Sequence, residues 1–165
     1  MLELLSRFAV RYVMVGGLAA IVHGSGRATF DIDIIPDRDE DNLTRLASAL
    51  KDVDARLRVP DTDPLDYAID ARALARFEVS TWRTSIGDIG IIAGTPTHRR
   101  GELARYVDLA SRAARRSAFG IPVLIADLDD VIESKEVLAR EPDLAALPEL
   151  HRLREGLAGG PGEAV

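Results

Sequence analysis

Two aspartates, Asp31 and Asp33, stand two residues apart in a stretch where apolar and acidic residues alternate, Asp31-Ile32-Asp33-Ile34. An alternation with period two is typical of a strand with one apolar face. Both carboxylates then point to the other face, with their Cα atoms about 6.5–7 Å apart at a rise of ~3.3 Å per residue. Mg²⁺ prefers such hard oxygen ligands, and the ion would offset the repulsion between the two charges. The pattern predicts a Mg²⁺ site on this strand.

A pair of glycines, Gly16 and Gly17, lies upstream of these aspartates. The pair follows an apolar run at 12–15, a predicted strand, and precedes a short helical segment at 18–23. Glycines after a strand let phosphate groups approach backbone N–H groups, and a helix start favours anions. By itself a D-x-D pattern is more often a solvated acidic strand face. The glycine turn favours phosphoryl or nucleotidyl transfer, which depends mainly on metal ions and positioned phosphates.

The order of the expected strands and helices predicts an α/β (α+β) fold with a mixed central sheet flanked by helices. Strands are expected at 12–15, 29–35, 77–84, 88–93 and 121–126, and helices at 2–9, 41–53, 66–75, 102–114, 128–140 and 143–155. Pro148 is expected to kink or split the last helix. Residues 54–63 are expected to form a loop. We expect one domain over 1–155 and a flexible glycine-rich tail over 156–165.

Composition narrows the class of protein. The chain has 165 residues, the usual size of one domain, and a net charge of −6, which argues against a dedicated nucleic-acid-binding protein. A basic stretch at 99–116 is still compatible with a local contact to RNA. The absence of cysteine excludes disulfides and zinc–thiolate sites. With no signal-peptide pattern and no apolar run near the roughly 18 residues of a membrane span, we expect a cytoplasmic protein without membrane contact.

Val15-Gly16-Gly17 followed by Asp31-Ile32-Asp33-Ile34 resembles the signature of the nucleotidyltransferase superfamily, whose members include DNA polymerase β-like proteins. The stretch VGGLAAIVHGSGRATFDIDI is similar to the minimal nucleotidyltransferases of the bacterial AbiE and Men toxin–antitoxin systems. The later stretch ADLDDVIESKEVLAREPDLAALPEL resembles their helix with a characteristic S-K, followed by an Arg and by an Asp that opens the last helix. The resemblance covers most of the chain and is weak over 54–76.

The resemblance implies a role for each matching residue. The two aspartates would bind Mg²⁺, and the glycine turn would hold the triphosphate of a nucleoside triphosphate. The other matching positions are Arg27 and Thr29, which line the nucleotide pocket, Lys135, which contacts phosphate, and the acid Asp143. From spacing alone Lys135 is more typical of a surface lysine with a Glu or Asp neighbour on its helix. A Lys135→Ala change is expected to weaken nucleotide binding with little effect on the melting temperature.

The chain departs from the family at one position. A third carboxylate normally stands on a later strand in a T-x-x-G-x-h-D-h pattern, and the matching stretch here is 84–91, with Gly90 where the acid is expected. Asp88 lies two residues earlier on the same strand face, and Glu78 on the preceding strand is a second candidate. Without either of them, no carboxylate base would activate the attacking hydroxyl.

The function implied is a Mg²⁺-dependent nucleotidyltransferase that moves a nucleoside monophosphate from an NTP to an acceptor hydroxyl. The toxin relatives suggest RNA, such as the 3′ end of tRNA, as acceptor and a cognate antitoxin as partner. A catalytically degenerate nucleotide-binding or antitoxin-like protein, and a small-molecule (antibiotic) nucleotidyltransferase, remain as alternatives. Among other residues, Trp82 is expected in the core, His23 to pack near the glycine turn, and Arg112, Arg115 and Arg116 to form a basic patch at a helix end.

Overall fold

The computed structural model describes residues 1–158, which form a seven-stranded mixed sheet with the strand order β3-β4-β5-β2-β1-β9-β8. Its strands are β1 (Tyr12–Val15), β2 (Ile32–Pro36), β3 (Arg56–Arg58), β4 (Val79–Thr84), β5 (Gly87–Ile92), β8 (Ala114–Ala118) and β9 (Ile121–Ile125). A separate hairpin-like pair joins β6 (Thr95–Pro96) and β7 (Leu103–Ala104). The helices are α1 (Leu2–Arg7), α2 (Gly16–Val22), α3 (Glu40–Asp52), α4 (Ala71–Arg76), α5 (Tyr106–Arg112), α6 (Leu128–Leu138) and α7 (Glu141–Ala158).

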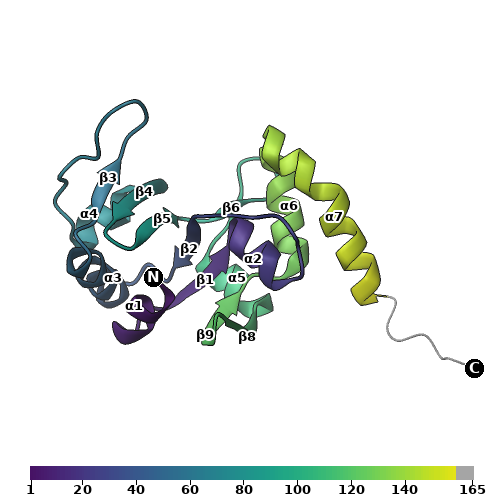
Figure 1. The fold of residues 1–165 in the computed structure, drawn as a ribbon, viewed down its shortest axis with the longest axis horizontal. Coiled ribbons are helices and arrows are strands. Elements are labelled where there is room, and N and C mark those ends of the chain that lie inside the picture. The colour runs from purple at the N-terminus through teal and green to yellow at the C-terminus, as the bar shows by residue number, and fades with distance from the viewer. Residues whose placement is uncertain (159–165) are drawn as a thin grey trace, which may run out of the picture.

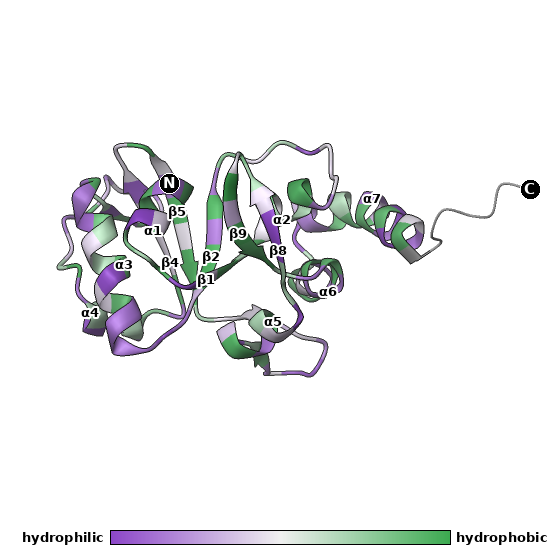
Figure 2. Cartoon of the chain, turned by 90° about the horizontal axis from the view of Figure 1, so that it is seen from below, coloured by the Kyte–Doolittle hydropathy of each residue, from purple (hydrophilic) through white to green (hydrophobic). Residues whose placement is uncertain are grey.

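The sheet separates two groups of helices (Figure 1). Helices α1, α3 and α4 cover one face, while α2, α5, α6 and α7 lie on the other. Seen from below, α7 projects away from the rest of the molecule, and its surface alternates between apolar and polar residues (Figure 2). This arrangement confirms the α/β (α+β) class with a mixed central sheet flanked by helices. None of the helices in residues 1–158 combines the length and apolarity of a membrane span.

The strand register aligns one row of residues across the sheet. Val15 of β1 pairs with Asp33 of β2 in the antiparallel direction, and Asp33 pairs with Gly90 of β5 in the parallel direction. Gly90 in turn pairs with Thr81 of β4, and Thr81 pairs with Arg58 of β3. Residues paired across neighbouring strands project to the same face. The row therefore joins the predicted Mg²⁺ ligand Asp33 to the far edge of the sheet.

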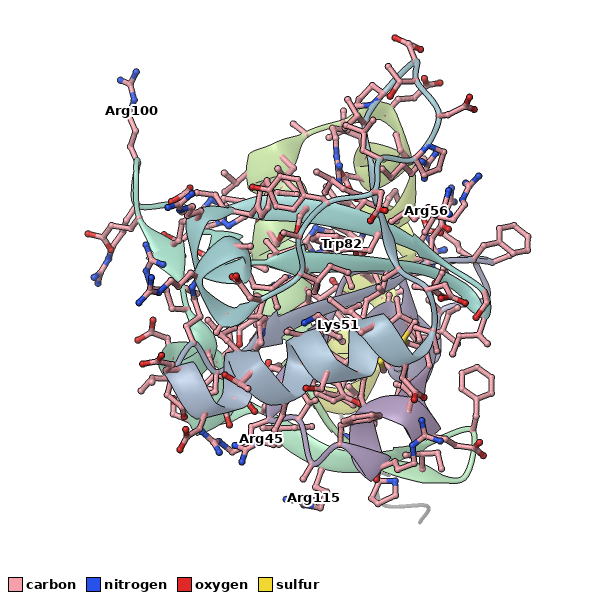
Figure 3. The ribbon with its side chains drawn as sticks, turned by 90° about the vertical axis from the view of Figure 1, so that its left-hand side faces the viewer. Arg45, Lys51, Arg56, Trp82, Arg100 and Arg115 are labelled. Carbon is pink, nitrogen blue, oxygen red and sulfur yellow. The ribbon has the colours of Figure 1, made fainter. Side chains whose placement is uncertain are left out.

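The opposite face of the sheet carries the aromatic part of the core. Trp82 is fully buried and contacts Tyr67 and Phe77 edge to face, at centroid distances of 6.3 and 6.4 Å. Its indole nitrogen donates to Ser80 Oγ at 2.9 Å, so its polar atom is satisfied. Figure 3, which looks onto α3, labels Trp82 on the strands beside that helix. The expectation that Trp82 is a core residue is confirmed.

Three predicted boundaries in the first half of the chain were wrong. The acidic strand begins at Ile32 rather than at residue 29, so Phe30 is 95% exposed instead of sharing the apolar face. The expected loop at 54–63 contains β3, which pairs with β4. The helix expected at 66–75 is α4, which starts at Ala71 because Asp70 caps it by accepting from the N–H of Ala73.

The basic stretch was also misassigned. Residues 114–118 form the edge strand β8, paired with β9, so Arg115 and Arg116 stand on a strand and not at a helix end. Arg112 does end α5, but its guanidinium donates to both oxygens of the buried Asp130, at 2.6 and 3.2 Å. Residues 114–118 form a strand because they pair with β9. The local sequence pattern does not show that pairing.

The last helix is longer than expected. Helix α7 runs without interruption through Pro148. Ala146 and Leu150, on either side of this proline, are both buried. It reaches Ala158, so residues 156–158 are helical, and the flexibility expected over 156–165 stays a prediction. The rest of the predicted tail, 159–165, lies outside the described residues.

Candidate active site

The glycine turn connects β1 directly to α2. Gly16 has φ of +68°, a conformation that L side chains rarely adopt. A Cβ at Gly16 would overlap the carboxylate of Asp33, and a Cβ at Gly17 would lie 2.9 Å from Thr29 Oγ1. Both glycines are thus required by the close approach of the chain around the D-x-D segment. The turn and the acidic strand are in direct contact.

Asp33 has a half-buried carboxylate held between two glycines. Besides Gly16, Gly90 has no room for a Cβ without overlap with Asp33. No hydrogen bond to this carboxylate is formed within residues 1–158. Burial raises the pKa of Asp33, the charge of Asp31 raises it further, and the cations Arg140 and Lys135 partly offset this. The charged form of the carboxylate is therefore disfavoured, and a bound cation would remove this cost.

Asp31 stands immediately before β2 and is exposed. Its charge acts on Asp33 and also on Arg83, whose pKa is raised first by its hydrogen bond to Asp88 and further by Asp31. Asp31 therefore lies close enough to Asp33 and to Arg83 for its charge to act on both. No group of three or more metal-binding side chains occurs among the described residues. A pair of carboxylates still fits Mg²⁺, which usually keeps several waters and is completed by substrate phosphates.

A cluster of ion pairs joins Lys135 of α6, Arg140 between the two helices and Asp143 of α7, and these residues line a cavity of about 70 Å³ together with Gly16 and Asp33. Lys135 Nζ donates to Asp143 Oδ1 at 3.0 Å, and Arg140 Nε donates to Asp143 Oδ2 at 2.6 Å. Burial raises the pKa of Asp143, but the hydrogen bonds from Arg140 and Lys135 outweigh it and leave the pKa lowered. The side chain of Lys135 is only 14% exposed. Lys135 is therefore not a surface lysine, and its removal is expected to lower stability, contrary to the expectation from sequence.

Three residues near the glycine turn, Arg27, Thr29 and His23, lie outside this cavity. Arg27 is exposed and donates to the backbone carbonyl of Ala145 on α7 at 3.3 Å, and neither it nor Thr29 lines the cavity. Thr29 packs against Gly17 instead. His23 ends α2 with its Nε2 2.8 Å from the carbonyl of Ala126. That contact fixes α2 to the segment after β9, which agrees with a packing role for His23.

Neither candidate for the third carboxylate stands at the position of Gly90. Asp88 is on the same strand face, two residues away, and its oxygens accept from Arg83 at 3.1 Å and from Arg58 at 3.3 Å. The hydrogen bond from Arg83 lowers the pKa of Asp88. Glu78 precedes β4 at the strand end remote from Asp88, where its charge acts on Arg38. The catalytic role assigned to Asp88 stays a prediction.

Sequence reasoning assigned no role to three cations of this face. Arg140 lines the cavity beside Lys135, and its spacing of three residues from Asp143 on one helix end was an available signal. Arg58 and Arg83 belong to the paired strands β3 and β4, and both donate to Asp88. Nothing in the local sequence distinguishes them from the other arginines.

No protein-family model matches the chain, and no curated protein matches it. Solved structures do. A nucleotidyltransferase described as putative, TM1012 from Thermotoga maritima, aligns with a TM-score of 0.51 and 18% identity over 95% of this chain and 88% of that one. ANT(2″)-Ia in complex with adenylyl-2″-tobramycin aligns with a TM-score of 0.56 and 16% identity over 92% of this chain and 82% of that one.

A solution structure of ANT(2″)-Ia, described as an antibiotic-resistance factor, gives a TM-score of 0.55 and 12% identity over 96% of this chain and 87% of that one. At such identities the likeness is one of fold. The chain therefore has the nucleotidyltransferase fold. The closer resemblance to AbiE and Men toxins stays a prediction.

Proposed function

We propose that the protein is a Mg²⁺-dependent nucleotidyltransferase that moves a nucleoside monophosphate from an NTP to an acceptor hydroxyl. The observation that carries the proposal is the position of Asp33. Its carboxylate has no hydrogen-bond donor within residues 1–158, lies between Gly16 and Gly90, and shares a cavity with Lys135 and Arg140. Anionic and cationic groups facing one another across a glycine turn suit a metal-bound triphosphate.

Each group has a distinct task in this proposal. Asp31 and Asp33 would hold Mg²⁺, which when bound neutralises phosphate charge. Gly16 and Gly17 give the triphosphate access to the backbone. Lys135 uses one of its three N–H donors on Asp143, so the remaining donors serve a phosphate oxygen.

The reaction is a single displacement at the α-phosphorus. The acceptor oxygen forms a new bond to phosphorus, and the bond from this phosphorus to the oxygen bridging to the β-phosphate breaks. Pyrophosphate leaves with the bonding electron pair, and the hydroxyl proton passes to solvent water. Asp88 is a weak proton acceptor because its pKa is lowered by Arg83. General bases contribute about 10²–10⁴-fold, so we expect a slow enzyme.

The toxin resemblance supports RNA, such as the 3′ end of tRNA, as acceptor and a cognate antitoxin as regulator. The likeness to ANT(2″)-Ia, solved with adenylyl-2″-tobramycin, favours a small-molecule acceptor as the second candidate, on fold alone. A third candidate is a non-catalytic nucleotide-binding protein, which Gly90 at the position of the third acid favours.

Transfer assays distinguish these candidates. The protein is incubated with Mg²⁺, each α-labelled NTP in turn, and total RNA, protein extract or an aminoglycoside. We expect label in RNA with wild type and none with Asp31→Asn or Asp33→Asn. Label in the aminoglycoside alone would select the second candidate. Nucleotide binding without label in any acceptor would select the third.

A further inference from the structure

A second cleft opens on the same sheet face as Asp33, at the β3–β4 edge. It has a volume of about 810 Å³ and is lined by Arg58, Thr81, Arg83 and the loop at 59–64. On β4 the side chains of this face are exposed or half-exposed, with Val79 at 65%, whereas Ser80 and Trp82 between them are buried. This half of the sheet is therefore open on the Asp33 face.

The cleft is connected to the catalytic carboxylates by the strand register. Thr81 pairs with Gly90, and Gly90 pairs with Asp33. Two strand spacings of ~4.8 Å put Thr81 roughly 10 Å from Asp33. Gly90 lies between them without a side chain, so nothing on β5 at this register stands between the cleft and Asp33. One terminal nucleotide with its 5′ phosphate can span such a distance.

The chemistry of transfer fixes which substrate lies on which side. In an in-line displacement the attacking and leaving oxygens are on opposite sides of the phosphorus. Lys135 and Arg140 share a cavity with Val15 and Gly16 at the end of β1, and this is where the pyrophosphate would leave. The acceptor hydroxyl must then approach from the β5–β4 side, which is the side of the cleft.

The floor of the cleft is cationic. Asp88 accepts from both Arg58 and Arg83, so two positive charges share one negative charge. The arginine side chains are 49% and 54% exposed, while the Asp88 side chain is 14% exposed. Asp88 thus orients two guanidinium groups and leaves most of their N–H donors free for a ligand. Arg56, which pairs with Arg83 across the strands, adds a third cation to this face.

The opposite wall is the loop, with the exposed Asp61 and Asp63. A ligand that presents phosphate to the arginines and hydrogen-bond donors to the loop satisfies both walls. A nucleotide residue has both groups, through its phosphate and its ribose hydroxyls.

We infer that this cleft, named here the Arg58–Arg83 cleft, binds the 3′-terminal nucleotides of a single-stranded RNA acceptor and directs its terminal hydroxyl toward Asp33. The inference rests on the proposed function for the identity of the reaction. Arg58 and Arg83 are positioning residues for the acceptor phosphate and take no part in nucleotide binding.

Binding of a short fluorescein-labelled single-stranded RNA tests the cleft without NTP, by fluorescence anisotropy over a range of salt concentrations. Arg58→Ala and Arg83→Ala are each expected to weaken binding by roughly tenfold or more, as for the loss of a hydrogen bond to a charged group. Each should also reduce the slope of log K against log salt by ~0.7, the value for one phosphate contact on a single strand.

Arg115→Ala and Arg116→Ala are the matched controls, since these exposed arginines stand on β8 at the other edge of the sheet. Arg56 and Arg115 lie on opposite sides of α3 in Figure 3. The controls should bind RNA like wild type. Equal RNA binding by the cleft variants and wild type, no RNA binding by wild type, or a loss confined to the β8 variants would overturn the inference.

Calorimetric titration with Mg²⁺ and ATP separates the two proposals. Arg58→Ala and Arg83→Ala should bind ATP like wild type, because both arginines lie across Gly90 from the triphosphate side. Wild type that binds RNA through the cleft but neither binds nor transfers a nucleotide would refute the proposed function and leave the cleft assignment standing. Reduced ATP binding in the arginine variants would contradict the assignment of the cleft to the acceptor.

Discussion

At the scale of single residues, the site is built from a carboxylate in an unfavourable place. Asp33 is half-buried, close to Asp31, and has no hydrogen-bond donor in the described part of the chain. Functional sites often retain such local cost because a ligand removes it. The Asp33 carboxylate fits in this place only because positions 16 and 90 are glycines, since a Cβ at either position would overlap it.

Asp33→Asn is expected to stabilise the metal-free protein at neutral pH by about 0.2–1 kcal/mol, the range for relief of a like-charge pair on a sheet. The folded-state pKa of Asp33 is raised, so the wild-type deficit exists when the group is ionised and disappears as the pH falls below its unfolded value. Thermal melts of both proteins should therefore converge in acid. The same variant should lose Mg²⁺-dependent ATP binding in calorimetry. The control variant Asp63→Asn, in an exposed loop, should change neither property. An Asp33→Asn protein as stable as wild type at every pH would refute the account of Asp33.

Gly90→Asp tests the absent third carboxylate. The new side chain requires the Asp33 carboxylate to turn away, and it adds a third negative charge, so the metal-free protein should melt at a lower temperature. With Mg²⁺ and NTP present, the added base should raise the transfer rate, by up to about 10²–10⁴-fold if it reaches the hydroxyl.

Gly90→Asn has the same shape without the charge and should lower the rate or leave it unchanged. A rate for Gly90→Asp no higher than that of Gly90→Asn would mean that Asp88, or no base at all, serves the reaction.

At the scale of elements, α6 and α7 are joined by the ion pairs of Asp143, which is 3% exposed. The same helices bring Lys135 and Arg140 to the cavity that Asp33 lines. Helix α7 is also tied to the loop after α2, where Glu149 accepts from the N–H of Gly26 at 2.7 Å. Elements distant in sequence therefore hold the cations in place over the glycine turn.

Lys135→Ala is expected to weaken Mg·ATP binding by roughly 10- to 100-fold, as for one hydrogen bond to a charged group. It should also lower stability, because the buried Asp143 keeps only Arg140 as a partner. Calorimetry and thermal melts measure the two effects separately. The chain has one other lysine, Lys51, which is exposed on α3, so Lys51→Ala is the matched control for both. Unchanged ATP affinity in Lys135→Ala would remove the residue from the nucleotide site.

At the scale of the whole molecule, the sheet has a covered half and an open half on its Asp33 face. Helices α2 and α5 contact β1, and α2 also contacts β2, whereas the outward side chains of β4 are accessible. The glycine turn and the carboxylates lie where these halves meet. In the proposed reaction the covered half would bind the nucleotide and the open half the acceptor.

Nucleotide should stabilise the entire fold only when Mg²⁺ is present. At a ligand concentration of about 100 times Kd, binding adds about 2.7 kcal/mol, which raises Tm by roughly 5–10 °C for a chain of this size. Differential scanning fluorimetry with ATP, with and without Mg²⁺ and EDTA, measures this. EDTA should abolish the shift and leave the nucleotide-free Tm unchanged. An equal shift by ATP in EDTA would show binding that does not use Asp31 and Asp33.

The sequence by itself determined the fold class and the two local patterns of the site, the glycine turn and the alternating strand of Asp33. Period-two alternation near Asp33 and the glycine pair at 16 and 17 are local patterns, and local patterns are set by backbone geometry that a few residues specify. Strand β8 was missed and the start of β2 was misplaced because strands exist through pairing with distant segments. For the same reason only the tertiary structure decided that Lys135 is buried against Asp143, that Asp88 is held by Arg58 and Arg83, and that Gly90 faces Asp33. Each of these facts depends on the register between strands or on the packing of two helices. The spacing of residues along the chain determines neither the register nor the packing.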